Sequence, residues 1–124
     1  MSLPDLIKRL SWPSVDLLKL DVEGAEISIL DSCPETVLRK IGQMTIEFHD
    51  FCGITNPKAV SKTIARLNEI GFYSVRMSRY GHQDTWLINR NMVSITLAEL
   101  VFSKAFLRNW RGLQRAAKRY FSGR

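Results

Sequence analysis

Apolar and polar positions in the first 51 residues alternate in a way that predicts short strands and helices. Residues 15–22 form a nearly continuous apolar run, which is typical of a parallel strand that is covered on both faces. Residues 24–32 predict a helix, and residues 34–41 predict a second, shorter helix that Gly42 ends. Residues 43–51 predict the next strand. The first 51 residues therefore predict a strand, a helical region of two short helices, and a second strand.

The following segment gives clearer signals. Asn56 precedes proline and a run of apolar residues at helical spacing, so we expect a helix over residues 57–70 with Asn56 as its N-cap. Residues 72–78 and 84–90 predict two strands of a hairpin. The order strand, helix, strand, helix, hairpin predicts an α/β layer fold.

The end of the chain has a different pattern and predicts a separate segment. We place the folded body in residues 1–91 and a basic helical tail in residues 92–124. One stripe of the predicted tail helix is apolar and consists of Phe102, Phe106, Trp110, Leu113, Ala117 and Tyr120. The opposite stripe is cationic and consists of Lys104, Arg108, Arg111, Arg115 and Lys118.

Charge and cysteine content narrow the class of protein. The net charge of +6 arises beyond residue 99, where basic residues occur without any acid. Cys33 and Cys52 stand apart from each other and from any CxxC pattern, so we expect two reduced, buried thiols rather than a disulfide or a zinc site. No apolar run reaches the roughly 18 residues of a membrane span, and no signal peptide is recognisable. We expect a cytoplasmic protein.

Several charged side chains cluster where the first strand is expected to end. In a strand Lys19 and Asp21 share a face, and Glu23 with Gly24 forms the turn into the helix. Ligands of open α/β sheets bind just outside the carboxyl ends of the strands, so Asp21 is a candidate ligand-contacting group. We expect Lys19 to pair with a nearby carboxylate. We expect Glu26 to be only a favourable charge in the first turn of the helix.

The stretch VDLLKLDVEGAEISIL, residues 15–30, resembles the signature of the FkbM-type methyltransferases, and MTIEFHDF, residues 44–51, resembles the strand that follows. The resemblance implies a partial class I, Rossmann-like methyltransferase sheet. It would contain strands four and five of that fold and a closing hairpin, followed by the amphipathic helix. Family members use S-adenosylmethionine to methylate hydroxyl groups, commonly on sugars or natural products.

The same resemblance implies roles for individual residues. Asp21 matches the acidic tip of strand four, beside the site of methyl transfer, and His49 lies at the end of strand five. We expect Asp21 or His49 to orient or deprotonate the acceptor hydroxyl. Glu23 and Glu47 are expected to contact the substrate. Apart from the resemblance, Trp12, Trp86 and Trp110 are expected to be packing residues.

The resemblance begins at strand four. The half of the domain that supplies the glycine-rich loop for S-adenosylmethionine is not recognisable, so we expect this chain alone to bind that cofactor poorly. Strand four would expose an unpaired apolar edge, which favours self-association or pairing with a complementing half. The chain is then a fragment, a split half, or a non-catalytic remnant that acts as a binding module.

The tail helix allows three interpretations. Packing of its apolar stripe on protein is the commonest fate of such a helix. Peripheral binding of residues 102–121 to an anionic membrane surface ranks second, because aromatic and cationic side chains suit the headgroup region. Nucleic-acid binding ranks last, since no base-reading motif accompanies the charge.

Overall fold

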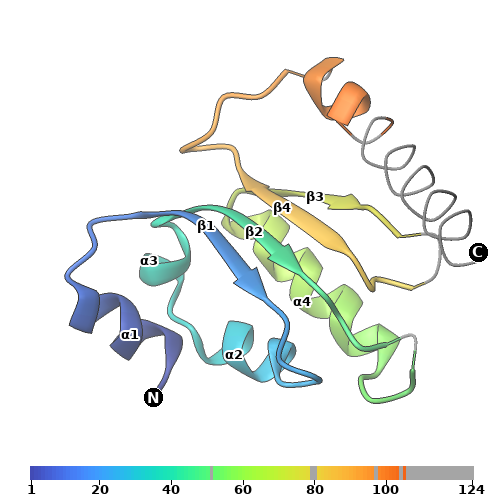
Figure 1. Ribbon diagram of the computed structural model, residues 1–124, viewed down its shortest axis with the longest axis horizontal. Coiled ribbons are helices and arrows are strands. Elements are labelled where there is room, and N and C mark those ends of the chain that lie inside the picture. The colour runs from blue at the N-terminus through green and yellow to red at the C-terminus, as the bar shows by residue number, and fades with distance from the viewer. Residues whose placement is uncertain (51, 79–80, 97, 104, 106–124) are drawn as a thin grey trace, which may run out of the picture. The chain divides into compact units, whose positions relative to one another are not determined.

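The computed structural model describes residues 1–50, 52–78, 81–96, 98–103 and 105. The chain divides into two compact units, Met1–Ser94 and Ile95–Arg124. The first unit contains all of the strands found among the described residues (Figure 1). Its elements, in chain order, are α1 (Leu3–Leu10), β1 (Val15–Leu20), α2 (Glu26–Ser32), α3 (Glu35–Leu38), β2 (Ile41–Ile46), α4 (Pro57–Ile70), β3 (Phe72–Arg76) and β4 (Thr85–Asn89).

The four strands form one sheet in the order β1-β2-β4-β3, so the predicted α/β class is confirmed. β1 and β2 run parallel, with Leu18 opposite Met44 and Leu20 opposite Ile46. β4 lies antiparallel between β2 and β3. Within the described residues β1 therefore has a neighbour on one side only, and it forms an edge of the sheet (Figure 1).

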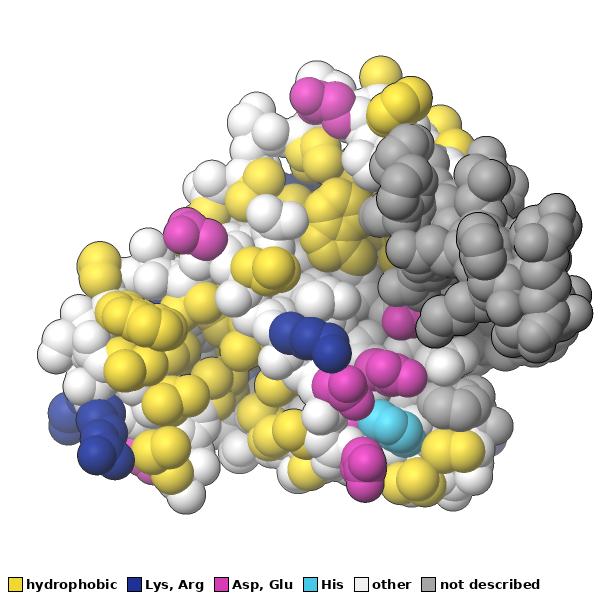
Figure 2. Space-filling view, in the orientation of Figure 1, with side chains coloured by type: hydrophobic (Ala, Val, Ile, Leu, Met, Phe, Trp, Pro, Cys, Tyr) yellow, Lys and Arg dark blue, Asp and Glu magenta, His cyan; other side chains and the backbone are white. Residues whose placement is uncertain are grey.

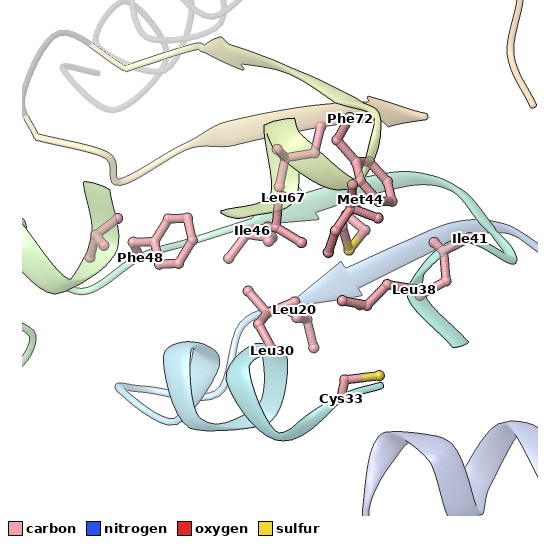
Figure 3. Close-up of a cluster of buried hydrophobic side chains, with 13 residues drawn as sticks. Leu20, Leu30, Cys33, Leu38, Ile41, Met44, Ile46, Phe48, Leu67 and Phe72 are labelled. Carbon is pink, nitrogen blue, oxygen red and sulfur yellow. The ribbon is translucent and has the colours of Figure 1, made fainter. Parts of the chain in front are cut away.

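The core lies between the sheet and the helices that follow β1 and β2. Alternate residues of the strands point toward these helices, because successive side chains of a strand face opposite sides. Figure 3 shows side chains from the strands meeting leucines of α2, α3 and α4. Among the completely buried core residues are Leu30, Leu38, Met44, Phe48, Leu67 and Leu87. Each such side chain contributes about 1.5–3 kcal/mol by leaving water.

Helix α4 was predicted with its correct bounds because its signals are local. The side chain of Asn56 accepts a hydrogen bond from the backbone N–H of Lys58 at 2.9 Å. Pro57 occupies the first turn, where its missing N–H costs no hydrogen bond. The helix ends at Ile70, and Gly71 is its C-cap, as expected.

The first half of the chain differs from the prediction in detail. The short helix ends at Leu38, and Gly42 lies inside β2 rather than after a helix. A Cβ on Gly42 would lie 3.1 Å from the backbone oxygen of Asp16, so this glycine allows β1 and β2 to approach closely. The strand expected over residues 43–51 accordingly begins earlier and ends at Ile46.

β1 is also less buried than its apolar sequence suggested. It ends at Leu20 rather than at residue 22, and the Leu17 side chain is 58% exposed. The prediction of a strand covered on both faces is wrong within the described residues, because the face that carries Leu17 and Lys19 is exposed. Trp12, which precedes it, was expected to pack but is 51% exposed.

Three other side chains were predicted to pack or to be buried. Trp86 is partly buried, and its Nε1 donates a hydrogen bond to Gln43 at 3.1 Å. Cys33 is buried as expected, whereas Cys52 is exposed. The prediction of a buried Cys52 was wrong, because residue 52 lies in a turn of the exposed loop after β2.

The described part of the second unit is the beginning of a helix. Thr96 and Glu99 form a capping box: Glu99 N–H donates to Thr96 Oγ1 at 3.2 Å, and Thr96 N–H donates to Glu99 Oε2 at 2.8 Å. Phe102 of the apolar stripe is exposed. The predicted residues beyond position 105 lie outside the described residues. Among the helices that are described, none combines the length and the apolar character needed to cross a membrane.

Candidate functional site

The carboxyl ends of β1 and β2 lie next to each other because the two strands are parallel. Glu47 follows β2, and its N–H donates to the carbonyl of Leu20 at 3.0 Å, which carries the pairing one residue further. Asp21 follows β1 directly and is exposed. Figure 2 shows acidic side chains and a histidine gathered over this part of the surface. Asp21 and Glu47 therefore follow the adjacent carboxyl ends of two parallel strands.

Asp21 forms an ion pair with Lys19, whose Nζ lies 3.1 Å from Asp21 Oδ2. This confirms the expected carboxylate partner of Lys19. Both side chains are exposed, so the pair contributes at most about 1 kcal/mol to stability. Asp21 therefore remains accessible to solvent.

The turn between β1 and α2 has an unusual backbone. Glu23 has a φ of 50°, and Gly24 has a φ of 106°, a region that side chains rarely adopt. A Cβ on Gly24 would lie 2.5 Å from Cγ2 of Ile54, which belongs to the loop after β2. The turn thus requires glycine for two reasons, and it directs the exposed Glu23 side chain into solvent.

Glu26 is the residue that sequence reasoning misjudged. Its side chain is 0% exposed, whereas a first-turn helix charge would lie in solvent. Its Oε1 accepts hydrogen bonds from the N–H groups of Val22 and Gly24, both at 3.2 Å, and Oε2 accepts from Gly24 at 3.0 Å. The carboxylate therefore fixes the turn that precedes its own helix.

The same carboxylate reaches His49. The Nδ1 atom of His49 lies 2.9 Å from Glu26 Oε1, and the His49 side chain is 11% exposed. Burial opposes ionisation of Glu26, but the N–H groups of Glu26, Gly24 and Val22, together with His49, outweigh it and lower the pKa of this carboxyl. Glu26 is consequently an ionised, buried acceptor at neutral pH.

A second carboxylate and imidazole pair follows immediately in the chain. His82 Nδ1 lies 2.7 Å from Asp50 Oδ2, and the His82 N–H donates to both oxygens of Asp50 at 3.1 Å. The Asp50 side chain is almost completely buried. This pair connects the end of β2 to the loop between β3 and β4, and it has no contact with the turn after β1 among the interactions described for these residues.

A hollow of about 290 Å³ lies elsewhere on the first unit, between α4 and the hairpin strands. Its lining residues are Ser61, Ile64, Ala65, Asn68, Ser74, Arg76, His82 and Thr85. None of the predicted site residues lines it. Asp21 and Glu23 instead lie at an open surface, Glu47 is half-buried with Gln83 Nε2 at 3.4 Å, and His49 is held by Glu26.

One signal in the sequence could have identified Glu26. Glu26, Leu30 and Cys33 follow helical spacing, and all three are buried on one side of α2. A glutamate on an apolar helical stripe is buried only when its oxygens are satisfied. The described residues contain no group of three or more His, Cys, Asp or Glu arranged to hold a metal ion.

A comparison with known protein families agrees with the resemblance seen in residues 15–30 and 44–51. A family model described as the methyltransferase FkbM domain matches residues 1–79. The matched range contains β1, the glycine turn, Glu26, β2 and His49. No curated protein and no solved structure matches the chain. Since the family model covers more than half of the 124 residues, the chain belongs to the FkbM methyltransferase domain family.

Proposed function

We propose that the chain serves S-adenosylmethionine-dependent O-methylation of a sugar or natural-product hydroxyl, as the C-terminal half of an FkbM methyltransferase domain. One observation carries this proposal. Asp21, Glu47 and His49 follow the adjacent carboxyl ends of two parallel strands, inside the segment that the family model matches. Open α/β sheets bind their ligands just outside the carboxyl ends of the strands.

On this proposal the sheet is the second half of a class I sheet. β1 and β2 correspond to strands four and five, and β3 with β4 is the closing hairpin. The one-sided pairing of β1 supports this assignment, because strand four would have a further neighbour in a whole sheet. The partner of β1 would come from a complementing half.

The residues present fit part of the cofactor. When bound, S-adenosylmethionine supplies a methyl group on a positively charged sulfonium. The exposed carboxylates of Asp21 and Glu23 fit that charge at the strand ends. A glycine-rich GxG loop, which would hold the amino-acid part, does not occur in the sequence. We therefore assign the larger part of the cofactor site to the complementing half.

On this proposal, this chain contains the residues that bind the methyl acceptor. Carboxylates accept hydrogen bonds from hydroxyl groups, so Glu23 and Glu47 suit a small molecule or glycan with several hydroxyls. Asp21 or His49 would orient the reactive hydroxyl or take its proton. Position contributes most of the rate enhancement in such a site, because the reacting groups are held close together.

The test uses the chain expressed together with the polypeptide encoded directly upstream in its gene. We expect transfer of labelled methyl from S-adenosylmethionine to members of a sugar panel. Asp21→Asn should lower kcat by about 10²-fold if it acts as a base. Lys19→Ala, which changes the ion-pair partner of Asp21, is the matched control and should stay within about twofold, the scale of an exposed pair. A folded assembly that binds the cofactor but methylates nothing would refute the proposal.

A non-catalytic binding module is the second candidate, and the edge of β1 favours it. Exposed apolar side chains surround this edge, and Figure 2 shows apolar surface gathered on that side of the view. On β1 and directly beside it in the chain, these side chains are Trp12, Leu17 and Val22. A strand of a complementing half, or of a second copy, would pair with the free backbone groups there.

Association through the β1 edge can be tested with one substitution on β1 and a control substitution on β3. Leu17→Lys should weaken association measured by sedimentation equilibrium, because it places a charge beside the pairing edge. Tyr73→Lys changes an exposed residue on β3, the opposite edge strand, and should leave association unchanged. An equal effect of both substitutions, or a wild type that is monomeric with and without the upstream polypeptide, would exclude the β1 edge.

The tail provides one further surface for such a module. Val101 and Phe102 are exposed, and residues 102–121 would place cations beside an anionic membrane. Binding to vesicles that contain phosphatidylserine, lost on Trp110→Glu, would support peripheral attachment. Absence of sedimentation with the vesicles at low salt would leave packing on protein as the role of the tail.

A further inference from the structure

We propose that the hollow between α4 and the hairpin strands binds the anionic group of an acidic sugar, and that Arg76 pairs with the carboxylate or phosphate of this ligand. The sugar is taken from the proposed function, which this site deepens, because the methyl acceptor is then an acidic glycan. The anion site itself depends only on the side chains of the hollow.

The hollow forms where small side chains meet between α4 and β3. On β3, Ser74 and Arg76 share a face with Phe72, whose side chain belongs to the core. Ala65 and Ser74 are too small to fill the space between the helix and the strand, so about 290 Å³ stays open. The residues that α4 contributes follow one stripe of the helix, and they are Ser61, Ile64, Ala65 and Asn68.

The polar side chains of the hollow suit an anion. The hydroxyls of Ser61 and Thr85 already donate to backbone carbonyl groups, both at 3.0 Å. Across the described part of the chain, the side chains of Arg76, Ser74 and Asn68 form no hydrogen bond or ion pair. None of the described residues that line the hollow is Asp or Glu. A guanidinium group can donate two parallel hydrogen bonds to a carboxylate or a phosphate, so Arg76 is the residue that selects this ligand class.

One wall of the hollow is fixed by a buried carboxylate. The Asp50 side chain is 1% exposed, and both of its oxygens accept from the His82 N–H at 3.1 Å. Its Oδ2 also lies 2.7 Å from Nδ1 of the His82 imidazole. His82 is therefore held in place before any ligand arrives, which lowers the ordering cost of binding. The site requires no hydrogen bond from the imidazole to the ligand.

The strand register relates the hollow to the carboxyl ends of β1 and β2. β3 runs parallel to these two strands, because β2 and β3 are both antiparallel to β4. One row of paired residues crosses the sheet at this edge, and it consists of Leu20, Ile46, Thr85 and Arg76. Three strand spacings separate β1 from β3, roughly 14 Å. The hollow is therefore a subsite for a part of the acceptor that is remote from the hydroxyl beside Asp21.

The test is a titration of the full chain, labelled with ¹⁵N at histidine, at constant ionic strength. The chain has two histidines, and of these His82 lines the hollow and His49 does not. We expect glucuronate or glucose 6-phosphate to shift the His82 resonances saturably and to leave those of His49 unchanged; binding of either one supports the site and identifies its anion. His82→Asn assigns the two signals. No saturable shift at His82 with either acid, or equally tight binding of glucose or of inorganic phosphate, would overturn the assignment.

Three variants separate a built site from general surface charge. Arg76→Gln should weaken binding of the acidic sugar at least about tenfold, because a charge-assisted hydrogen bond is lost. Arg90→Gln removes the same charge from an exposed position outside the hollow, and it should change the affinity by no more than about twofold because salt screens distant exposed charges. Ala65→Leu fills the hollow from an exposed helical position without changing the charge, and it should also weaken binding. Equal effects of the two arginine variants, or unchanged binding in Ala65→Leu, would overturn the site.

Turnover of the complemented domain tests whether the bound sugar is the acceptor. Arg76→Gln should raise KM for an acidic acceptor while kcat stays near the wild-type value, because a remote subsite binds the ground state and the transition state alike. Methylation of neutral sugars only would overturn the acidic acceptor and leave the proposed function standing. Absence of methylation of any sugar would refute the proposed function, and the titration would still decide whether the hollow binds the anion.

Discussion

Gly24→Ala tests the most constrained point of the site, the turn that carries Asp21 and Glu23 toward solvent. Two costs add at this position. An L-residue in the left-handed region loses about 1–2 kcal/mol, and Gly24 has a φ of 106°. The new Cβ would also lie 2.5 Å from Ile54 Cγ2, and such overpacking costs about 1–3 kcal/mol. Alanine restricts the unfolded chain and returns about 0.4–1 kcal/mol. We expect a net loss of about 1–4.5 kcal/mol.

The two costs can be measured separately because the chain offers a matched glycine. Gly53 has a φ of 77°, and a Cβ placed on it would meet no atom within 4 Å. Gly53→Ala should therefore show the backbone cost alone, about 1 kcal/mol. Ile54→Ala removes Cγ2, the atom that the new Cβ of Gly24→Ala would contact. Because Ile54 is 61% exposed, Ile54→Ala alone should lower the free energy of unfolding only slightly.

Urea unfolding of the full chain, followed by far-UV circular dichroism, gives the four free energies of a double-mutant cycle. In the Ile54→Ala background, Gly24→Ala should cost about 1–3 kcal/mol less than in the wild type, which is the overlap term. Additivity of the two substitutions would show that the turn does not pack on the loop after β2. A cost of Gly24→Ala no larger than that of Gly53→Ala would refute the same contact.

Three further predictions follow from burial and charge. Because the pKa of Glu26 is lowered below its ordinary value of 4.5 in the folded chain, its contribution to stability is complete above pH 4.5 and disappears as the pH falls through the folded-state pKa; urea midpoints should fall more steeply there for the wild type than for Glu26→Gln. Asp21→Asn should change the free energy of unfolding by less than about 1 kcal/mol, since its ion pair is exposed; a larger loss by urea titration would give Asp21 a structural role. A maleimide should label Cys52 in the folded chain but Cys33 only after unfolding, because Cys33 is buried and burial raises its pKa; mass spectrometry of the labelled peptides decides this, and equal labelling of both would contradict the burial.

Local signals explain what the sequence could predict. The bounds of α4 follow from Asn56, Pro57 and Gly71, which act within a few residues of themselves. The two hairpin strands were recognisable for the same reason. Their order in the sheet was not, because pairing of β4 with β2 joins segments that are about forty residues apart, and a strand pattern does not name its neighbour.

Gly42 shows how a local signal can be misread. A glycine after an apolar stretch commonly ends a helix, and the same residue also allows two backbones to approach. The backbone of Asp16 on the neighbouring strand shows that Gly42 allows a close approach and does not end a helix. The position of that strand depends on the tertiary structure, so the local sequence does not reveal it. The boundaries of α3 and β2 were therefore displaced together.

Glu26 was misjudged for a more instructive reason. A charged residue in the first turn of a helix is usually solvated, so its favourable interaction with the helix dipole seemed a sufficient explanation. Burial changes the requirement, because each oxygen of a carboxylate removed from water needs donors. The donors come from the turn two to four residues earlier and from His49, 23 residues later. The glycine turn and the histidine are thus parts of one arrangement, and substitution of Glu26 should disturb both, whereas substitution of Asp21 should disturb neither.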